Sequence, residues 1–186
     1  MEQREKIRLN YQNKLFEIID RLEEKPTLLL HSCCGPCSTT CLALLKKHFL
    51  VTVLYYNPNI EPEAEYEKRK KEQIRFLKES DKEGEIKFLD CDYDNETFRS
   101  KTKGLEKEVE GGARCGVCFR LRLQYTAEKA KELGFTYFGT TLTVSPHKNS
   151  KVINEIGAVL ESIYGIKYLY SDFKKKNGYK RSIELS

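Results

Sequence analysis

The sequence predicts a three-layer α/β domain built on a mainly parallel, five-stranded sheet. Short apolar segments of strand length alternate with longer segments of helical length, in the order α-β-α-β-α-β-α-α-β-α-β. Unusual loops follow the strands, and ligands of such sheets bind beyond the carboxyl ends of the strands, where strand order reverses. We therefore expect five loops to meet at one edge of the sheet. They are residues 31–37, 57–60, 90–95, 140–148 and 171–178.

The first half of the chain is expected to contain four helices and three strands. Residues 3–24 place apolar side chains along one helical face, and Pro26 ends this helix. Pro62 suits the first turn of a long charged helix over 62–79. The other elements expected here are strands over 28–31, 51–56 and 86–89 and helices over 38–47 and 95–103.

The second half begins with a polar loop over 104–114 that contains Gly111-Gly112. Gly134 ends the helix that follows this loop. The expected elements are helices over 116–133 and 150–163 and strands over 136–140 and 166–170. We find no repeat and no linker, so residues 1–186 are expected to form a single domain, with a helix in residues 1–25 packed on it.

Composition excludes several classes of protein. A chain of 186 residues with 39% hydrophobic residues can bury a core without disulfides. No apolar run approaches the roughly 20 residues that span a bilayer, and the charged start MEQREKIRLN lacks the apolar core of a secretory signal. We expect a cytoplasmic protein that does not bind membranes. The 33 basic residues against 28 acidic ones give a modest preference for anionic partners.

The seven cysteines indicate metal binding or redox chemistry, because cytosolic thiols are kept reduced. Cys34 and Cys37 follow the first strand, and Cys115 and Cys118 stand at the start of a later helix. Free backbone N–H groups at a helix start favour thiolates over thiols. Two C-x-x-C pairs supply four thiolates, which suffice for tetrahedral zinc or an iron–sulfur cluster.

Three further cysteines need separate interpretations. Cys33 adds a fifth thiol, which a structural zinc site does not need, although a cluster with a second metal or a reactive thiol does. Adjacent side chains in a turn usually diverge, so Cys33 and Cys34 need not bind the same atom. Cys41 is expected to be a small buried hydrophobe. Cys91 follows a strand and fits either the site or the core.

Two other functional classes stay open at this point. A strand followed by Cys34-Gly35-Pro36-Cys37 at a helix start is also the arrangement of thioredoxin-like dithiol oxidoreductases. That alternative leaves Cys115 and Cys118 unexplained. A zinc-bearing RNA-binding module without catalysis is the second alternative.

Several other polar residues are candidates for the site. His31 ends the first strand and His147 lies in a polar loop, so either can donate protons or bind metal, and the loop favours His147. Asp90, Asp92 and Asp172 follow strands and suit the same roles. The commoner role of such aspartates is to cap a helix or close a turn.

A basic segment near the end of the chain is interleaved with aromatic residues. Cations for phosphates and aromatic rings for stacking suit single-stranded RNA loops. The basic residues are Lys174, Lys175, Lys176, Lys180 and Arg181.

Five segments together resemble the cobalamin-independent epoxyqueuosine reductases. They occur in the expected order over about residues 27–186. The segments are His31–Ser38, Tyr56–Pro62, Gly112–Phe119, Thr140–Lys148 and Ser171–Tyr179.

The resemblance implies an adenine-nucleotide-hydrolase-like, Rossmann-like fold and the last step of queuosine biosynthesis. In that step an epoxide on the wobble base of a tRNA anticodon loop is reduced with two electrons and two protons. It also implies a 4Fe-4S cluster, a neighbouring second metal ion (iron or zinc) and a low-potential electron donor.

Within this resemblance, we assign residue roles as hypotheses, based on the chemistry that the reaction requires. Cys34, Cys37, Cys115 and Cys118 are expected to provide most of the cluster thiolates, and Cys33 to hold the second metal with an aspartate. His147 or Asp172 is expected to protonate the departing oxygen. The segment 174–181 is expected to hold the anticodon backbone.

Overall fold

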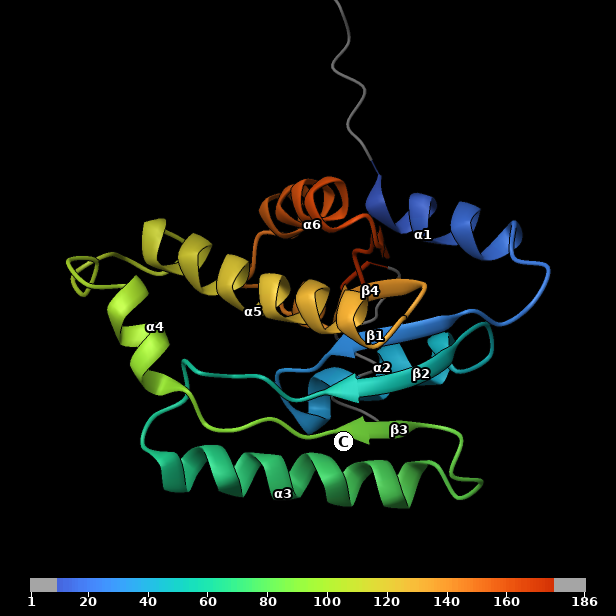
Figure 1. Cartoon of the computed structure of the whole chain (residues 1–186), viewed down its shortest axis with the longest axis horizontal. Helices are drawn as coiled ribbons and strands as arrows, with labels where there is room; N and C mark the ends of the chain where they lie inside the picture. The colour runs from blue at the N-terminus through green and yellow to red at the C-terminus, as the bar shows by residue number, and fades with distance from the viewer. Residues whose placement is uncertain (1–9, 176–186) are drawn as a thin grey trace, which may run out of the picture.

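The computed structural model describes residues 10–175 and contains one five-stranded sheet. Every pairing is parallel, and the strand order is β3-β2-β1-β4-β5 (Figure 1). This confirms the expected α/β architecture. The strands are β1 (Thr27–His31), β2 (Leu50–Leu54), β3 (Lys87–Leu89), β4 (Tyr137–Thr140) and β5 (Lys167–Tyr168).

Six α-helices and one 3-10 turn connect and cover these strands within the described residues. They are α1 (Tyr11–Asp20), α2 (Gly35–Leu45), α3 (Glu63–Ser80), α4 (Asn95–Lys101), α5 (Ala113–Glu132), the 3-10 turn η1 (Leu142–Val144) and α6 (Ser150–Tyr164). None of the helices in residues 10–175 is long and apolar enough to cross a membrane.

The sheet separates two apolar cores because successive side chains of a strand point to opposite faces. Leu28 and Leu30 of β1 pack in one core with side chains from α1, α2 and α3. Leu29 packs in the other core with side chains from α5 and α6. All three leucines are fully buried, and each contributes about 1.5–3 kcal/mol of burial free energy. The result is the three-layer arrangement of helices, sheet and helices.

Short polar side chains cap several helices. Asn10 accepts hydrogen bonds from backbone N–H groups in the first turn of α1, and Asn149 does the same for α6. Asp94 accepts from the N–H of Thr97 at the start of α4. Gly165 ends α6 with φ of 70°, which a residue without a Cβ adopts at little cost.

Two helices begin earlier than the sequence indicates. α2 begins at Gly35 instead of residue 38, because Pro36 fits the first turn of a helix. α5 begins at Ala113 instead of residue 116. Both C-x-x-C pairs therefore lie at the very start of a helix. The described part of the first helix ends at Asp20, short of residue 24, and its expected residues 3–9 lie outside the described range.

Strand order places the topological switch point between β1 and β4. From β1 the chain adds β2 and then β3 on one side, and it later adds β4 and β5 on the other side. The loops after β1 and β4 therefore leave their strands in opposite directions, which is the switch point where such sheets bind ligands. Figure 1 shows α4 and the first turns of α5 beyond the arrowhead ends of β2 and β3.

Packing between α6 and β5 leads to a stability prediction. An added Cβ at Gly157 would overlap the ring of Tyr168, which is itself buried. Gly157→Ala should therefore lower the free energy of unfolding by about 1–3 kcal/mol, the usual cost of overpacking. Urea unfolding measures the loss. Gly116→Ala is the control, since a Cβ there meets no atom within 4 Å. It should be neutral or stabilising by up to about 1 kcal/mol, and an unaltered Gly157→Ala protein would contradict the packing.

Candidate metal centre at the ends of β1 and β4

His31, the last residue of β1, connects three strand ends. Its Nδ1 lies 2.9 Å from the hydroxyl of Thr140, and its Nε2 lies 3.0 Å from the carbonyl oxygen of Tyr56. A carbonyl only accepts, so Nε2 donates to it and Nδ1 accepts from the hydroxyl. Burial, and after it the charge of Arg122, lowers the pKa of His31 to about 4. This fully buried neutral ring connects the end of β1 to Thr140 and Tyr56 by hydrogen bonds, and it is not a proton donor at neutral pH.

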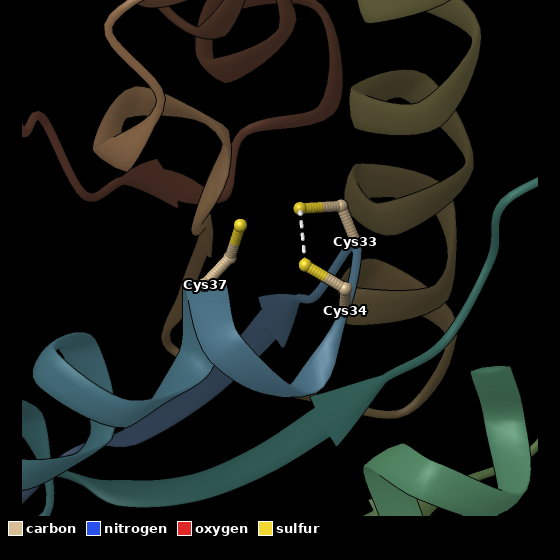
Figure 2. Close-up of side chains that lie close together, drawn as sticks. All are labelled: Cys33, Cys34 and Cys37. Atoms are coloured by element: carbon tan, nitrogen blue, oxygen red, sulfur yellow. Dashed lines mark hydrogen bonds between the residues drawn. The ribbon is translucent and has the colours of Figure 1, made fainter. Parts of the chain in front are cut away.

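Three cysteine side chains meet directly after His31. The sulfur atoms of Cys33, Cys34 and Cys37 all lie within 4.8 Å of one another, and we call them the cysteine triad. Figure 2 shows the three sulfurs turned toward a common space from the loop after β1 and the first turn of α2. Among the described residues this is the one group of three or more His, Cys, Asp or Glu side chains close enough to share a metal ion.

The expectation that Cys33 and Cys34 diverge is wrong. Their sulfur atoms lie 3.8 Å apart. Two thiolates on one tetrahedral ion, with metal–sulfur distances of about 2.3 Å, are also separated by about 3.8 Å. The two adjacent residues can therefore bind one ion or two neighbouring ions.

The triad concentrates negative charge on Cys33. Hydrogen bonds from the thiols of Cys34 and Cys37 hold the pKa of Cys33 well below its usual value, and the Lys148 cation lowers it further. The same hydrogen bonds raise the pKa of Cys34 to about 11 and also raise the pKa of Cys37. Negative charge in the triad therefore falls first on Cys33, where a bound cation would stabilise it.

Cys115 and Cys118 lie outside the triad, in the first two turns of α5. The backbone N–H of Gly111 donates to the sulfur of Cys115 over 3.3 Å. The carbonyl oxygen of Cys118 accepts from Nε of the buried Arg122 over 3.2 Å. Since Arg122 also lowers the pKa of His31, this part of α5 faces the end of β1.

The other two cysteines have different surroundings. Cys41 is fully buried in the core, as the sequence predicts. Cys91 is half-buried beyond β3, and its thiol donates to the carbonyl oxygen of Tyr55 over 3.0 Å. Cys91 lines a pocket with Asp90 and Asp92, apart from the triad.

Hydrogen bonds confirm the expected convergence for the described parts of the loops after β1, β2, β4 and β5. Cys33 contacts Thr141, which follows β4, through the backbone N–H at 3.5 Å. Asn57, in the loop after β2, donates to the carbonyl oxygen of Ser32. The hydroxyls of Thr143 and Ser171 lie 3.1 Å apart and join the loops after β4 and β5.

The proposed proton donors and basic residues have distinct positions. His147 is exposed in the turn after η1. Asp172 is buried, with one carboxylate oxygen 3.8 Å from Nζ of Lys175. Lys174 is half-buried, and its ammonium donates to the carbonyl oxygen of Lys148. Lys176, Lys180 and Arg181 lie outside the described residues.

Sequence reasoning missed three residues beside the triad. Ser32, Ser38 and Gln73 are buried and hydrogen-bonded to one another. The serines are inconspicuous next to four cysteines, and Gln73 lies in a strongly charged helix that suggests exposure. The one signal in the sequence is that the polar Gln73 lies on the same helical face of α3 as the apolar side chains of Tyr66 and Leu77.

These features define a doubly wound α/β protein with a thiol-based candidate metal centre at its strand switch point. Comparison with known proteins identifies the family. Residues 28–186 match the family model described as epoxyqueuosine reductase QueH, and the chain belongs to this family of oxidoreductases. The resemblance inferred from the five segments is confirmed at this level.

Three curated relatives illustrate the similarity, and each is called epoxyqueuosine reductase QueH. The protein of Staphylococcus epidermidis is 44% identical over 185 residues, covering 96% of this chain and 78% of that protein. The protein of Streptococcus pyogenes is 44% identical over 183 residues, covering 96% and 72%. The protein of Staphylococcus aureus is 40% identical over 185 residues, covering 96% and 77%.

The burial of the thiols leads to a labelling prediction. In the reduced, metal-free protein, iodoacetamide should modify Cys33, Cys34 and Cys37 while Cys41 stays unmodified, because only Cys41 is enclosed by the core. Mass spectrometry of the peptides over time measures the rates. The same reaction in denaturant should label all seven cysteines and is the control. Equal labelling of Cys41 in the folded protein would show that α2 does not bury it.

Proposed function

We propose that this chain removes the epoxide oxygen of epoxyqueuosine at the wobble position of tRNA and thereby forms queuosine. The reaction takes two electrons and two protons, converts the epoxide carbons into an alkene and releases the oxygen as water. A low-potential electron donor of unknown identity supplies the electrons. We place this reaction in the cytoplasm.

The observation that supports the proposal is the cysteine triad at the strand switch point of a chain in this family. A substrate held beyond the carboxyl ends of β1 and β4 would lie against these sulfurs. The alternatives of a dithiol oxidoreductase and a zinc-bearing RNA-binding module predict different metal contents, so experiment can separate all three.

The donor set fits the implied metals. Thiolates are the preferred ligands of iron–sulfur clusters and of zinc, and the triad supplies three within 4.8 Å. We propose that Cys34, Cys37, Cys115 and Cys118 would hold most of a 4Fe-4S cluster. Cys33, with an aspartate, would hold the second metal. When bound, the cluster supplies electrons singly and the second metal acts as a Lewis acid.

The chain itself would position the substrate and handle protons. Lys174 and Lys175 follow β5 next to the loop after β4, where their charges suit the phosphates of the anticodon loop. His147 is exposed at this edge and is free to meet substrate. Asp172 is buried, so it would exchange protons only with a group that reaches it. Either residue can supply a proton to the departing oxygen.

The first test measures iron, acid-labile sulfide and activity on protein purified without oxygen. About four or more irons with matching sulfide, and conversion of epoxyqueuosine in tRNA with a strong reductant, are expected. Cys115→Ala should lose the cluster and the activity, because one thiolate ligand is missing. Cys41→Ala, which alters a buried cysteine outside the triad, should retain both.

Other outcomes of this test contradict the proposal. Normal iron and sulfide in Cys115→Ala would remove that residue from the ligand set. Zinc alone after anaerobic reconstitution would favour the RNA-binding module. Metal-free protein that reduces insulin disulfides would favour the dithiol oxidoreductase.

A second test concerns the basic segment. The double substitution Lys174→Glu and Lys175→Glu should weaken tRNA binding while iron content stays normal. The slope of log affinity against log salt should fall by about one for each phosphate that the protein no longer neutralises. Lys82→Glu with Lys87→Glu is the matched control, because both lysines are exposed near the opposite, amino edge of the sheet. Equal affinity of the test variant and wild type would move the RNA site elsewhere.

A further inference from the structure

Gln73 is a fully buried amide in a helix that is mostly exposed to solvent. α3 spans 18 residues, and only Tyr66, Gln73 and Leu77 are buried in it. The exposed fraction of Gln73 is 0%. Burial of an amide away from water requires hydrogen-bond partners, since an unpaired polar group costs about 1–3 kcal/mol.

Its partners flank the cysteine triad on both sides. Oε1 of Gln73 lies 2.8 Å from the hydroxyl of Ser32 and 3.1 Å from the hydroxyl of Ser38. Ser32 directly precedes Cys33, and Ser38 directly follows Cys37. One amide oxygen thus joins the two ends of the turn that bears all three sulfurs.

The same two hydroxyls also reach the middle of the turn, although each has one proton and so donates either to Gln73 or to the carbonyl oxygen of Cys34. The Ser38 hydroxyl lies 2.9 Å from the carbonyl oxygen of Cys34 and the Ser32 hydroxyl 3.3 Å from it. Gly35 faces α3 closely, because a Cβ at this glycine would lie 3.7 Å from Cβ of Phe76. The turn therefore rests on α3, and Gln73 provides the polar part of that contact.

Packing alone does not account for an amide at this position. Nε2 of Gln73 is buried without a hydrogen-bond partner among the described residues. An apolar side chain of similar volume would avoid that cost in the folded state. Such an apolar side chain would lose the hydrogen bonds through which Gln73 connects Ser32 to Ser38.

We propose that Gln73 is a positioning residue for the metal centre, which holds the cysteine triad in a metal-binding arrangement through Ser32 and Ser38. This inference rests on the proposed assignment of the triad as metal ligands. Residues that orient metal ligands without binding the metal themselves typically contribute 10–100-fold to metal affinity. The role of Gln73 requires no contact with the metal or the substrate.

The test is titration of the reduced, metal-free protein with Co²⁺, followed by the thiolate-to-cobalt charge-transfer absorption. Gln73→Leu should weaken Co²⁺ binding about 10–100-fold and change the intensity of the cobalt bands. Circular dichroism and the thermal midpoint show whether the variant is folded at the titration temperature. Gln124→Leu is the matched control, since its amide pairs with Glu128 on the surface of α5.

A double-mutant cycle separates positioning from general stability. Ser38→Ala should also weaken Co²⁺ binding, and adding Gln73→Leu should cost less than it does in the wild-type background, because the two residues share one hydrogen-bonded unit. A folded Gln73→Leu protein with the Co²⁺ affinity and cobalt absorption bands of the wild type would overturn the proposal. So would a double variant whose loss of Co²⁺ affinity equals the product of the losses in the two single variants. Should Gln73→Leu fail to fold, wild-type affinity of Ser38→Ala would overturn it.

The result also separates this inference from the metal assignment. If the wild-type protein shows no thiolate-to-cobalt band, the triad is not a metal site and the assignment itself fails. If the wild-type protein binds Co²⁺ and the Gln73→Leu protein binds it equally well, the assignment stands and only the role of Gln73 fails.

Discussion

The site depends on the hydrogen bonds by which His31 joins the ends of β1, β2 and β4. β1, β2 and β4 end in register, since His31 pairs with Leu54 and with Thr140, but the loops that leave these strand ends could still diverge. The buried imidazole contacts the hydroxyl of Thr140 on one side and the carbonyl of Tyr56 on the other. The N–H of Thr141 also donates to the carbonyl oxygen of His31. The loops after β1 and β4 therefore leave the sheet from one fixed point, and the cysteine triad begins two residues after His31.

A neutral ring is essential for this tie. A charged imidazolium would need two acceptors, whereas Thr140 offers a hydroxyl that can also donate. Burial and the nearby Arg122 cation both disfavour the charged form, so the pKa of His31 is lowered to about 4. The ring thus keeps one donor and one acceptor at neutral pH.

The sequence was sufficient for the architecture and for the edge of the sheet at which the cysteine triad lies. Alternation of apolar and helical segments identified all five strands, because core burial leaves a strong local pattern. The C-x-x-C pairs pointed to the correct edge of the sheet. The convergence of Cys33 and Cys34 was missed, since it depends on side-chain rotamers. Gln73 was missed because contacts between residues 41 positions apart leave no trace in local periodicity.

Lys174 shows a different limit of sequence reasoning. Its charge and its aromatic neighbours suggest a freely exposed phosphate ligand, yet the side chain is half-buried and donates to the carbonyl oxygen of Lys148. The same ammonium can contact a phosphate only with its remaining protons. A lysine in this position joins the last described segment to the loop after β4 as well as adding charge.

The two C-x-x-C pairs are organised by different means. The triad is held by α3, by buried hydroxyls and by the strand tie, so the protein forms this half of the site by itself. Cys115 instead contacts Gly111 within its own helix start, after a loop whose Val109 is 76% exposed. Segments with few buried contacts rearrange at low free-energy cost. If Cys115 and Cys118 join the triad in holding metal, the bound metal supplies the interaction that brings their sulfurs to the triad, because in this structure they lie outside it.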